Sequence, residues 1–377
     1  MAIPFIDLPL QHSHFRAQFL ERVGEVLDSG QFILGKPVKD FEEAFAEFLG
    51  CEYAVGVNSG TDALLFALKA LEIGPGHEVI CPGFGFIATV DVILRTGATP
   101  VLVDIDPATY CINSEKIAEA ITDKTKAIIP VHLFGRACDM SRIMEIANAR
   151  GIAVIEDACQ ACGTMVDDNF CGAIGKCGAF SFYPTKNLGG IGDGGMLTTN
   201  DEAIYQKALL LRDHGRNRMN GSFDIIGYNS RLDTIQAVYL DMKIEDLEES
   251  NVDRVENARL YEKLFQGSEV RTPEFLDDGS HTYNLYTIQV RDRDRLQNFL
   301  KENEIGSAVY YQRGLHREPA LEKLGLTRGP LPVTDDVSRK VLSLPCFPAM
   351  KRGDVERVAA VVLEFLDRNE SFERRRR

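Results

Sequence analysis

One lysine stands where an amine could act as a nucleophile. An apolar run, Ala179–Tyr183, is ended by Pro184 and followed by Lys186, and five glycines occupy the seven positions Gly189–Gly195. The run is typical of a short buried strand, and the glycines indicate a backbone that bends tightly or lies close to another group. Lys186 is then either an exposed loop lysine or a partly buried amine that forms a Schiff base, since partial burial keeps an amine reactive.

Two acids end a second apolar run, Val154-Ile-Glu-Asp-Ala-Cys-Gln160. Ligands of open α/β sheets bind at the carboxyl ends of the strands. Neighbouring residues of a strand point to opposite sides, so Glu156 and Asp157 are not expected to form a catalytic pair. A single buried acid that faces a ligand needs a cationic partner to stay ionised, and a protonated pyridine nitrogen would supply one.

A third segment, Val55-Gly-Val-Asn-Ser-Gly-Thr-Asp-Ala-Leu64, predicts a strand, a turn and the start of a helix. Free backbone N–H groups and the positive end of the helix dipole make such a junction a natural seat for phosphate. The segment equally fits a plain helix start that is capped by Ser59 or Thr61. Both interpretations stay open on this segment alone.

Two further patterns suggest chemistry that we do not expect. Gly190–Gly195 matches the dinucleotide-binding pattern, but it opens no helix and leads into the strand-like Met196–Thr199, so we reject a Rossmann site. Cys159 and Cys162, followed by Cys171 and Cys177, invite zinc or redox proposals, but the second pair is separated by five residues. We therefore expect no metal.

The elements around these residues alternate between short β-rich runs and helical ones. This alternation predicts an α/β domain with a mostly parallel mixed sheet that is buried on both faces. The expected strands are residues 53–57, 78–81, 100–103, 127–130, 153–155, 179–183 and 196–199. The expected helices are residues 14–27, 38–49, 61–71, 86–95, 114–120, 140–149 and 203–212.

The chain is expected to divide into two domains. Past residue 230 the pattern is helical to about Leu264, and a smaller α+β unit follows. Its expected elements are strands at 283–290 and 307–311 and helices at 294–303 and 354–367. We predict a large domain over residues 1–250, which includes the amino-terminal helices, and a small α+β domain over residues 251–377.

The bulk composition excludes several classes of partner. A net charge of −14 over 377 residues argues against nucleic acid and anionic membranes, because both bind basic surfaces. There is no uninterrupted apolar run of membrane-spanning length and no basic-then-apolar secretory signal at the start. Nine scattered cysteines indicate reduced thiols, and we expect a cytoplasmic protein.

Taken together, these segments resemble the sugar aminotransferases of the DegT type, a branch of the fold-type I enzymes that use pyridoxal 5′-phosphate. The resemblance covers nearly the whole chain, from Pro4–Leu8 to Leu342–Pro345. Its most specific parts are Asn58-Ser-Gly-Thr-Asp-Ala63, Glu156-Asp-Ala-Cys-Gln160, Ser181-Phe-Tyr-Pro-Thr-Lys186, Gly192-Asp-Gly-Gly195 and Asn229-Ser-Arg-Leu-Asp233.

The resemblance implies a role in cofactor binding for each of several positions. Lys186 would hold pyridoxal 5′-phosphate as a Schiff base and then act as the acid and base that moves the proton between Cα and C4′. Asp157 would keep the pyridine nitrogen protonated. The other implied cofactor contacts are Gly60, Thr61, Ser181 and Asn229 at the phosphate, Phe86 stacked on the ring and Gln160 at the phenolic oxygen.

The resemblance also implies a partner and a substrate class. In this family the asparagine comes from the neighbouring subunit, so it implies a homodimer with shared active sites. Relatives commonly transfer an amino group from glutamate to a keto group, here expected at C3, of a nucleotide-linked sugar. Arg231, Tyr311 and His316 are the implied substrate residues, with Arg231 either a bidentate carboxylate ligand or a structural ion pair. The chain departs from the family at Tyr310–His316 and Ala161–Gly163, and both departures affect sugar recognition rather than cofactor binding.

Three alternatives remain beside this hypothesis. A cyclitol aminotransferase would act on a scyllo-inosose-type ketone with glutamine as the donor. A sugar dehydratase is disfavoured because such relatives carry histidine at the position of Lys186. A non-catalytic regulator that binds the cofactor is disfavoured because Lys186, Asp157 and Gln160 are all present. The cluster Gly189–Gly195 is expected to let the backbone pass close to the cofactor and to the facing subunit, and positive φ angles are expected there.

Overall fold

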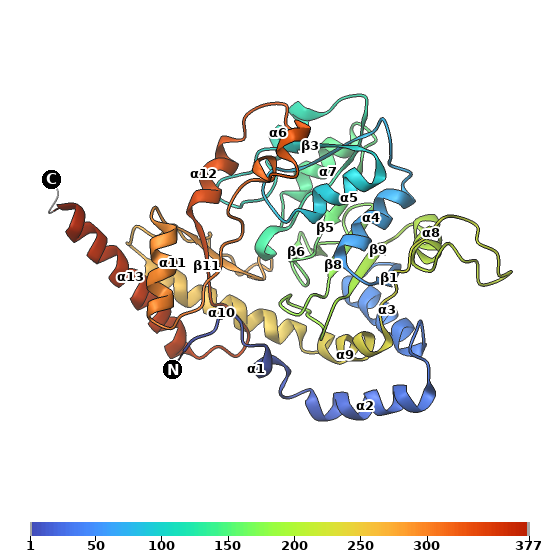
Figure 1. Ribbon diagram of the computed structural model, residues 1–377, viewed down its shortest axis with the longest axis horizontal. Coiled ribbons are helices and arrows are strands. Elements are labelled where there is room, and N and C mark those ends of the chain that lie inside the picture. Colours follow the sequence, from blue (N-terminus) through green and yellow to red (C-terminus); the bar gives the residue numbers. More distant parts are fainter. Residues whose placement is uncertain (1, 375–377) are drawn as a thin grey trace.

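A seven-stranded sheet forms the centre of the computed structural model, which describes residues 2–374 (Figure 1). The order across the sheet is β1 (Tyr53–Val57), β9 (Gly195–Thr199), β8 (Cys177–Ser181), β5 (Ala153–Asp157), β4 (Thr125–Ile128), β2 (Glu78–Pro82) and β3 (Thr99–Val103). β9 runs antiparallel to β1 and β8, and the other pairings are parallel. The predicted α/β class with a mostly parallel mixed sheet is confirmed.

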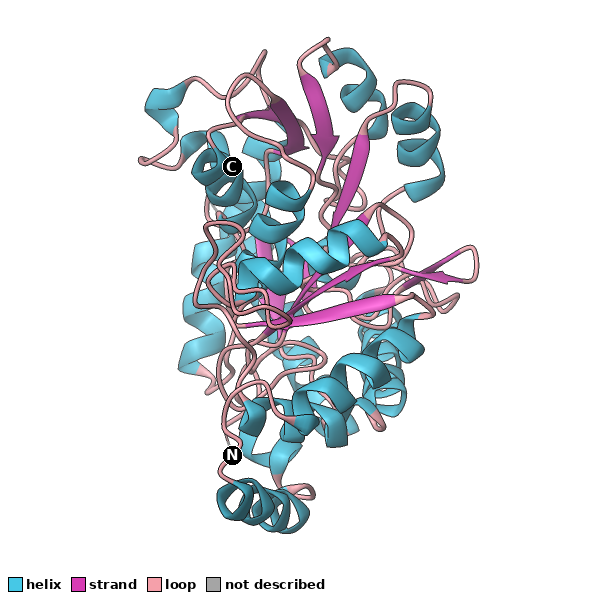
Figure 2. Ribbon diagram, turned by 90° about the vertical axis from the view of Figure 1, so that its right-hand side faces the viewer, coloured by secondary structure: helices cyan, strands magenta, loops and turns pink. Residues whose placement is uncertain are grey.

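The sheet is buried on both faces because alternate side chains of each strand enter different hydrophobic clusters. In β2, Val79 and Cys81 face one cluster and Ile80 faces the other. One face is covered by α4 (Gly60–Ala70), α5 (Ala88–Thr96) and α8 (Glu202–Arg212). The other is covered by α6 (Ser114–Ala120) and α7 (Met140–Asn148). In Figure 2 the strands accordingly run between helices.

The amino-terminal helices pack at the β1 end of the sheet. α3 (Lys36–Leu49) buries Phe41 and Phe45 against Phe180 and Phe182 of the chain around β8. α2 (Arg16–Ser29) packs on α9 (Thr234–Ile244) through a small cluster that contains Tyr239, and it lies along the lower edge of the molecule in Figure 1. The short α1 (Leu8–His12) precedes them.

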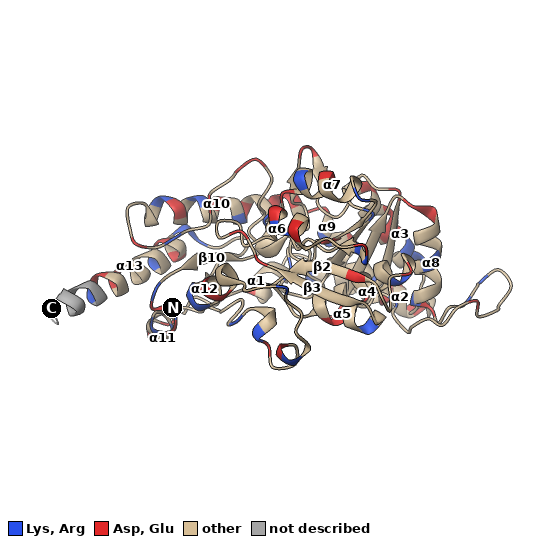
Figure 3. Ribbon diagram, turned by 90° about the horizontal axis from the view of Figure 1, so that it is seen from above, with Lys and Arg blue, Asp and Glu red and all other residues tan. Residues whose placement is uncertain are grey.

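The carboxyl-terminal part has its own hydrophobic cluster. It is built from α10 (Leu247–Phe265), α11 (Arg293–Glu302), α13 (Arg352–Arg374) and the antiparallel pair β10 (Tyr286–Gln289) and β11 (Val341–Leu344). α10 crosses residue 250, and Leu247 packs with the amino-terminal part while Tyr261 packs with the carboxyl-terminal part. The predicted boundary at residue 250 therefore stays a prediction. Figure 3 shows charges of both signs along α10 and α13.

Several predicted elements differ in detail. The strand expected at 307–311 does not form, because only Ala308 is paired there, through an isolated bridge to Ser343. The helical region after residue 230 is two helices, since α9 ends at Ile244 and α10 begins at Leu247. The remaining elements are α12 (Pro332–Lys340), the pair β6 (Met165–Val166) and β7 (Asn169–Phe170), and the 3₁₀ turns η1 (Leu133–Gly135), η2 (Leu315–Arg317) and η3 (Glu322–Leu324).

The helices within residues 2–374 include none that is both long and apolar enough to cross a membrane. The longest of these helices, α13, carries charged residues such as Asp354, Glu356 and Arg357 among its apolar ones.

Candidate active site

A cavity of about 760 Å³ opens beside the carboxyl ends of the strands β1, β5 and β8. Its volume is in the range of small-molecule sites, and carboxyl ends of strands are where open α/β sheets bind ligands. Eight of the residues predicted from the sequence line it: Gly60, Thr61, Phe86, Asp157, Gln160, Ser181, Lys186 and Tyr311. Segments that are far apart in the sequence therefore meet here.

Lys186 lies on a turn that follows β8, where its backbone N–H donates to the Tyr183 carbonyl at 2.9 Å. Burial lowers the pKa of its ammonium, and nearby Cys159 and Asp157 oppose this effect only in part. A larger share of the amine is thus unprotonated than in a free lysine, which is what a nucleophilic amine requires. The exposed-loop interpretation of Lys186 is wrong.

Asp157 ends β5 and lines the same cavity as Lys186. Its Oδ2 accepts a hydrogen bond from the Thr89 hydroxyl at 2.8 Å, and its Oδ1 accepts one from the Cys159 N–H at 3.3 Å. The residue is 7% exposed. A buried carboxylate whose hydrogen bonds come from a hydroxyl and a backbone N–H is well placed to face a cationic ligand group.

Glu156 points to the other side of β5, as predicted. Its two carboxylate oxygens accept from the backbone N–H groups of Gly172, Ile174 and Gly175 at 2.9, 2.8 and 2.6 Å. These contacts tie the loop before β8 to the back of β5. Glu156 therefore stabilises the sheet and takes no part in the cavity.

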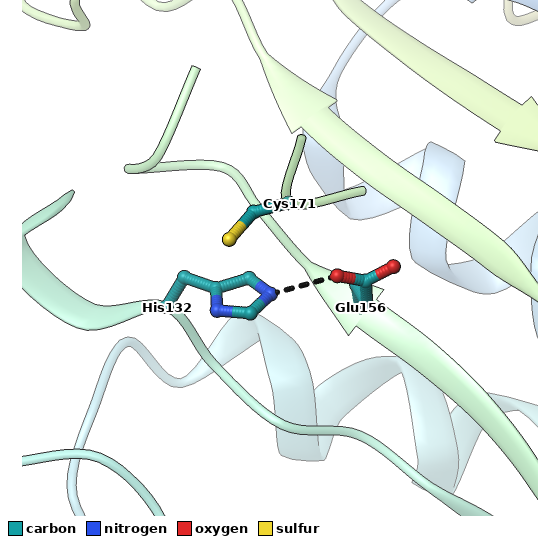
Figure 4. Close-up of side chains that lie close together, drawn as sticks. All are labelled: His132, Glu156 and Cys171. Atoms are coloured by element: carbon teal, nitrogen blue, oxygen red, sulfur yellow. Dashed lines mark hydrogen bonds and ion pairs between the residues drawn. The ribbon is translucent and has the colours of Figure 1, made fainter. Parts of the chain in front are cut away.

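A buried cluster around Glu156 has ligand atoms close enough for a metal ion, within 4.8 Å of one another in His132, Glu156 and Cys171 (Figure 4). His132 Nδ1 accepts from the Cys138 N–H at 3.1 Å, so its proton lies on Nε2, which donates to Glu156 at 3.0 Å. A metal would have to displace these bonds and those from the loop to Glu156. We assign the cluster a structural role.

The turn after β1 combines the two interpretations that the sequence left open. Ser59 caps α4 by accepting from the Asp62 N–H at 3.1 Å, while Gly60 and Thr61 line the cavity with the first backbone amides of the helix. The first amides of a helix have no partner within it. A Cβ at Gly60 would lie 2.5 Å from Cys159 Sγ, so only glycine fits here.

An aromatic and amide wall closes another side of the cavity. Gln160 accepts from the Phe134 N–H at 2.8 Å and donates to the Tyr311 hydroxyl at 3.2 Å. The rings of Tyr311 and Phe86 lie 6.4 Å apart between centroids. Phe86 is 56% exposed, so its ring is available to a planar ligand. Burial raises the pKa of Tyr311, which keeps its hydroxyl protonated.

Three predicted residues do not line the cavity of their own chain. Arg231 forms an ion pair with Asp213 at 2.7 Å and donates to the side chain of Asn229 at 2.5 Å, so its guanidinium fork is engaged. Asn229 is exposed. His316 lies 3.0 Å from a carboxylate oxygen of Asp335. The structural ion pair is the interpretation of Arg231 that these contacts favour.

The glycine cluster is needed for close packing and not for unusual dihedral angles. The positive φ angles predicted for Gly189–Gly195 are wrong, because none of these glycines has one. A Cβ would instead lie 2.3 Å from the Pro184 carbonyl oxygen at Gly189, and 2.3 Å from the Ser59 carbonyl carbon at Gly195. The cluster leads into β9 and opens no helix, which agrees with the rejection of a Rossmann site.

Several residues in or behind the cavity wall carry no strong local sequence signal. Asn284 and Glu318 come from the carboxyl-terminal part, Ile6 comes from the amino terminus, and Thr89 holds Asp157 from α5. The first three lie in segments without glycine clusters or strand-end acids. Thr89 stands three residues after Phe86, so it is the residue of this set that its spacing from a predicted site residue could have indicated.

Known proteins share this arrangement over almost the whole chain. The model of the DegT/DnrJ/EryC1/StrS aminotransferase family matches residues 14–363. The chain belongs to this family. The resemblance inferred from its motifs is therefore confirmed, and the protein is an aminotransferase.

Individual relatives of this aminotransferase match over nearly their full lengths. A Geobacillus stearothermophilus protein named a pleiotropic regulatory protein is 41% identical and covers 97% of this chain and 99% of its own. An Acidithiobacillus ferrooxidans UDP-N-acetyl-3-dehydro-alpha-D-glucosamine 3-aminotransferase is also 41% identical, with 96% and 97% covered. The crystal structure of S. venezuelae DesV in complex with a ketimine intermediate has a TM-score of 0.93 at 37% identity, with 97% and 98% covered.

A second buried lysine of the aminotransferase lies beneath the turn that carries Lys186. Lys243 of α9 is 5% exposed and donates to the Gly189 carbonyl at 3.0 Å. Burial lowers its pKa to about 7, with a contribution from Arg254, while Cys162 opposes the shift. In the unfolded chain a lysine titrates near 10.4. Between these pH values the unfolded state binds one more proton than the folded state does.

We therefore expect wild-type stability to rise with pH relative to that of a Lys243→Met variant. The difference in free energy of unfolding should grow by about 1 kcal/mol per unit between pH 7 and pH 10 and be constant below pH 7. Urea unfolding of both proteins at pH 6, 7, 8 and 9 checks this. Parallel pH dependences of the two free energies of unfolding above pH 7 would contradict it. Both proteins carry the same cysteines, so the titration of the thiols drops out of the difference.

Proposed function

We propose that this protein uses pyridoxal 5′-phosphate to move an amino group from glutamate to the keto group, at C3, of a nucleotide-linked sugar. The observation that carries the proposal is that Lys186, an amine with a lowered pKa, and the buried acid Asp157 line one cavity. The Acidithiobacillus relative, named for a 3-aminotransferase reaction on a UDP-linked keto sugar, supports the substrate class.

The chemistry of the donor set fits this cofactor. Gly60 and Thr61 stand at the start of α4, where backbone amides are free, and Ser181 adds a hydroxyl at the end of β8, which together suit a phosphate. Phe86 offers a ring face, and Gln160 offers an amide beside it. The cavity is thus lined by an amine, a carboxylate, a group of donors that suits an anion, and the face of an aromatic ring.

The bound cofactor would supply an electron sink for the carbon atom that loses its proton. Lys186 would anchor the cofactor through its amine and, once free, carry the proton at the carbon that bears the transferred amino group. Asp157 would hold a positive charge on the ring nitrogen, since an opposite charge in contact favours the protonated form. Thr89 would keep that carboxylate in place.

We further propose that two copies of the chain share each site, with Asn229 reaching the cofactor phosphate of the other copy. The charged residues of this chain that line the cavity are Asp157, Asp193, Glu318 and Lys186, so three carboxylates face one amine. An anionic nucleotide would need further cations. A loop after α8 extends from the body of the molecule (Figure 1) and exposes Met219 and Ile226 by 98% and 94%, which suits burial in a partner.

The test begins with the purified protein and pyridoxal 5′-phosphate. Glutamate should convert the bound cofactor to its pyridoxamine form, and added UDP-linked 3-keto sugar should return it with formation of the 3-amino sugar, as followed by absorbance and mass spectrometry. Absence of exchange with both glutamate and glutamine would sink the proposal. Scyllo-inosose with glutamine tests the cyclitol alternative in the same assay.

The name of the Geobacillus relative favours one second candidate, a regulator that binds the cofactor without turnover. Binding of the cofactor with no amino-group exchange would select this candidate.

Light scattering tests whether two copies share each site, since a monomer with full activity would contradict the shared site.

A further inference from the structure

A buried amide network lies behind the turn that carries Lys186. Asn187, the next residue, is 4% exposed and points into the protein. Its Nδ2 donates to Asn251 Oδ1 at 2.6 Å and to the Thr282 carbonyl at 3.2 Å. Its Oδ1 accepts from Asn284 Nδ2 at 2.8 Å. Three hydrogen bonds therefore hold the residue beside the reactive amine.

Asn251 extends this network to the wall that carries Asp157. It belongs to α10, is 8% exposed, and donates through Nδ2 to the Cys162 carbonyl at 3.1 Å. The next residue, Gly163, has a φ of +85°, and a Cβ there would lie 2.5 Å from Asn251 Nδ2. Glycine at this position makes room for the contact.

Four segments thus meet at two side chains. They are α10, the segment that follows Asp157, the turn of Lys186 and residues 282–284, of which Asn284 itself lines the cavity. Each bond is buried, so moving one segment alone leaves an amide or carbonyl without a partner. Lys243 holds the far end of the same turn through Gly189.

We propose that Asn187 and Asn251 are positioning residues that fix the Lys186 amine relative to Asp157. Reacting groups lose effectiveness when they are misplaced by about 1 Å, and side chains on turns are held only by their supporting contacts. The reaction that the Lys186 amine carries out rests on the proposed function. Its position and its environment are properties of the protein without cofactor.

The experiment measures the Lys186 amine in cofactor-free protein. The rate of reductive methylation by formaldehyde and cyanoborohydride is followed at the Lys186 peptide by mass spectrometry from pH 6 to pH 10, which yields an apparent pKa. Asn251→Ala is the decisive variant, because Asn251 does not line the cavity and its hydrogen bond to the turn goes to Asn187 and not to Lys186. Asn257→Ala is the matched control, since Asn257 lies on the same helix, is 8% exposed and donates to the Phe347 carbonyl at 3.1 Å.

We expect Asn187→Ala and Asn251→Ala each to raise the apparent pKa by about one unit, because a released turn exposes the amine to water. At neutral pH this slows methylation about 10-fold. The double variant should shift no further than either single one. In cofactor-loaded protein kcat should fall about 10- to 100-fold while KM for glutamate changes less than about 3-fold.

An Asn251→Ala profile equal to wild type, or an equal shift in Asn257→Ala, would overturn the proposal. If Asn187→Ala does not fold, as judged by circular dichroism, Asn251→Ala decides alone. The methylation profile needs neither cofactor nor sugar, so it stands or falls independently of the proposed aminotransfer.

Discussion

Replacing Lys186 with alanine is expected to lower kcat for amino-group exchange by about 10⁴-fold. The substitution removes both the covalent anchor and the proton carrier, and a positioned acid–base group alone contributes about 10²- to 10⁴-fold. The visible absorbance of covalently bound cofactor should disappear, while cofactor should still associate through the proposed phosphate seat at Gly60. The measurement combines the absorbance spectrum with single-turnover exchange of glutamate.

Stability separates this effect from loss of the fold. Burial of the Lys186 ammonium opposes its protonation, so alanine should leave the thermal midpoint of the cofactor-free protein within about 3 °C of wild type. Lys176→Ala is the matched control, because Lys176 lies on the surface near β8 and pairs with Asp201 at 2.7 Å. Retention of the absorbance band by Lys186→Ala would end the proposed function.

The second large effect is expected for Asp157→Asn, which keeps the size of the side chain and removes its charge. An opposite charge in contact shifts a pKa by about one to three units, so the ring nitrogen should lose its proton about 10- to 10³-fold more readily. We expect kcat with glutamate to fall by about 10²- to 10³-fold. Steady-state kinetics and nitrogen NMR of the bound cofactor measure the two quantities.

Thr89→Val distinguishes the charge of Asp157 from its hydrogen bond. This variant removes the hydroxyl that donates to Asp157 at 2.8 Å and retains the carboxylate. Its kcat should fall less than about 10-fold, since a neutral hydrogen bond contributes about 1 kcal/mol. Equal losses in Thr89→Val and Asp157→Asn would show that position, and not charge, is what Asp157 supplies.

Most of the large sheet could be predicted because its strands carry local signals. β1 has the predicted bounds, and β2, β3, β4, β5, β8 and β9 differ from prediction by a few residues at their ends. Each is a short apolar run between turn residues, which is typical of buried parallel strands. The failure at 307–311 has the same cause, because Ala308–Tyr311 is apolar and aromatic, yet it pairs with β11 only at Ala308, and Val309, Tyr310 and Tyr311 line the cavity.

The cavity residues divide in a similar way. Lys186, Asp157 and Gly60 end or closely follow the strands β8, β5 and β1. These strands run in the same direction, so their carboxyl ends lie together and bring the three segments to one cavity. Asn284 and Glu318 reach that edge through the packing of the carboxyl-terminal part, and no local pattern encodes this packing. The sequence allows Arg231 to be either a ligand for a substrate carboxylate or one half of a structural ion pair, and its contact with Asp213 favours the ion pair.

For this protein the sequence by itself determined the fold class, the family and the residues that can do chemistry. These properties follow from local order along the chain: apolar runs, turn residues and the single lysine after a buried strand. Only the tertiary structure decided that Glu156 binds the loop before β8, why Gly189–Gly195 are glycines, and that Asn251 contacts the turn of Lys186 through Asn187. Each of these depends on contacts between segments far apart in the chain, and such contacts leave no trace in the spacing of residues.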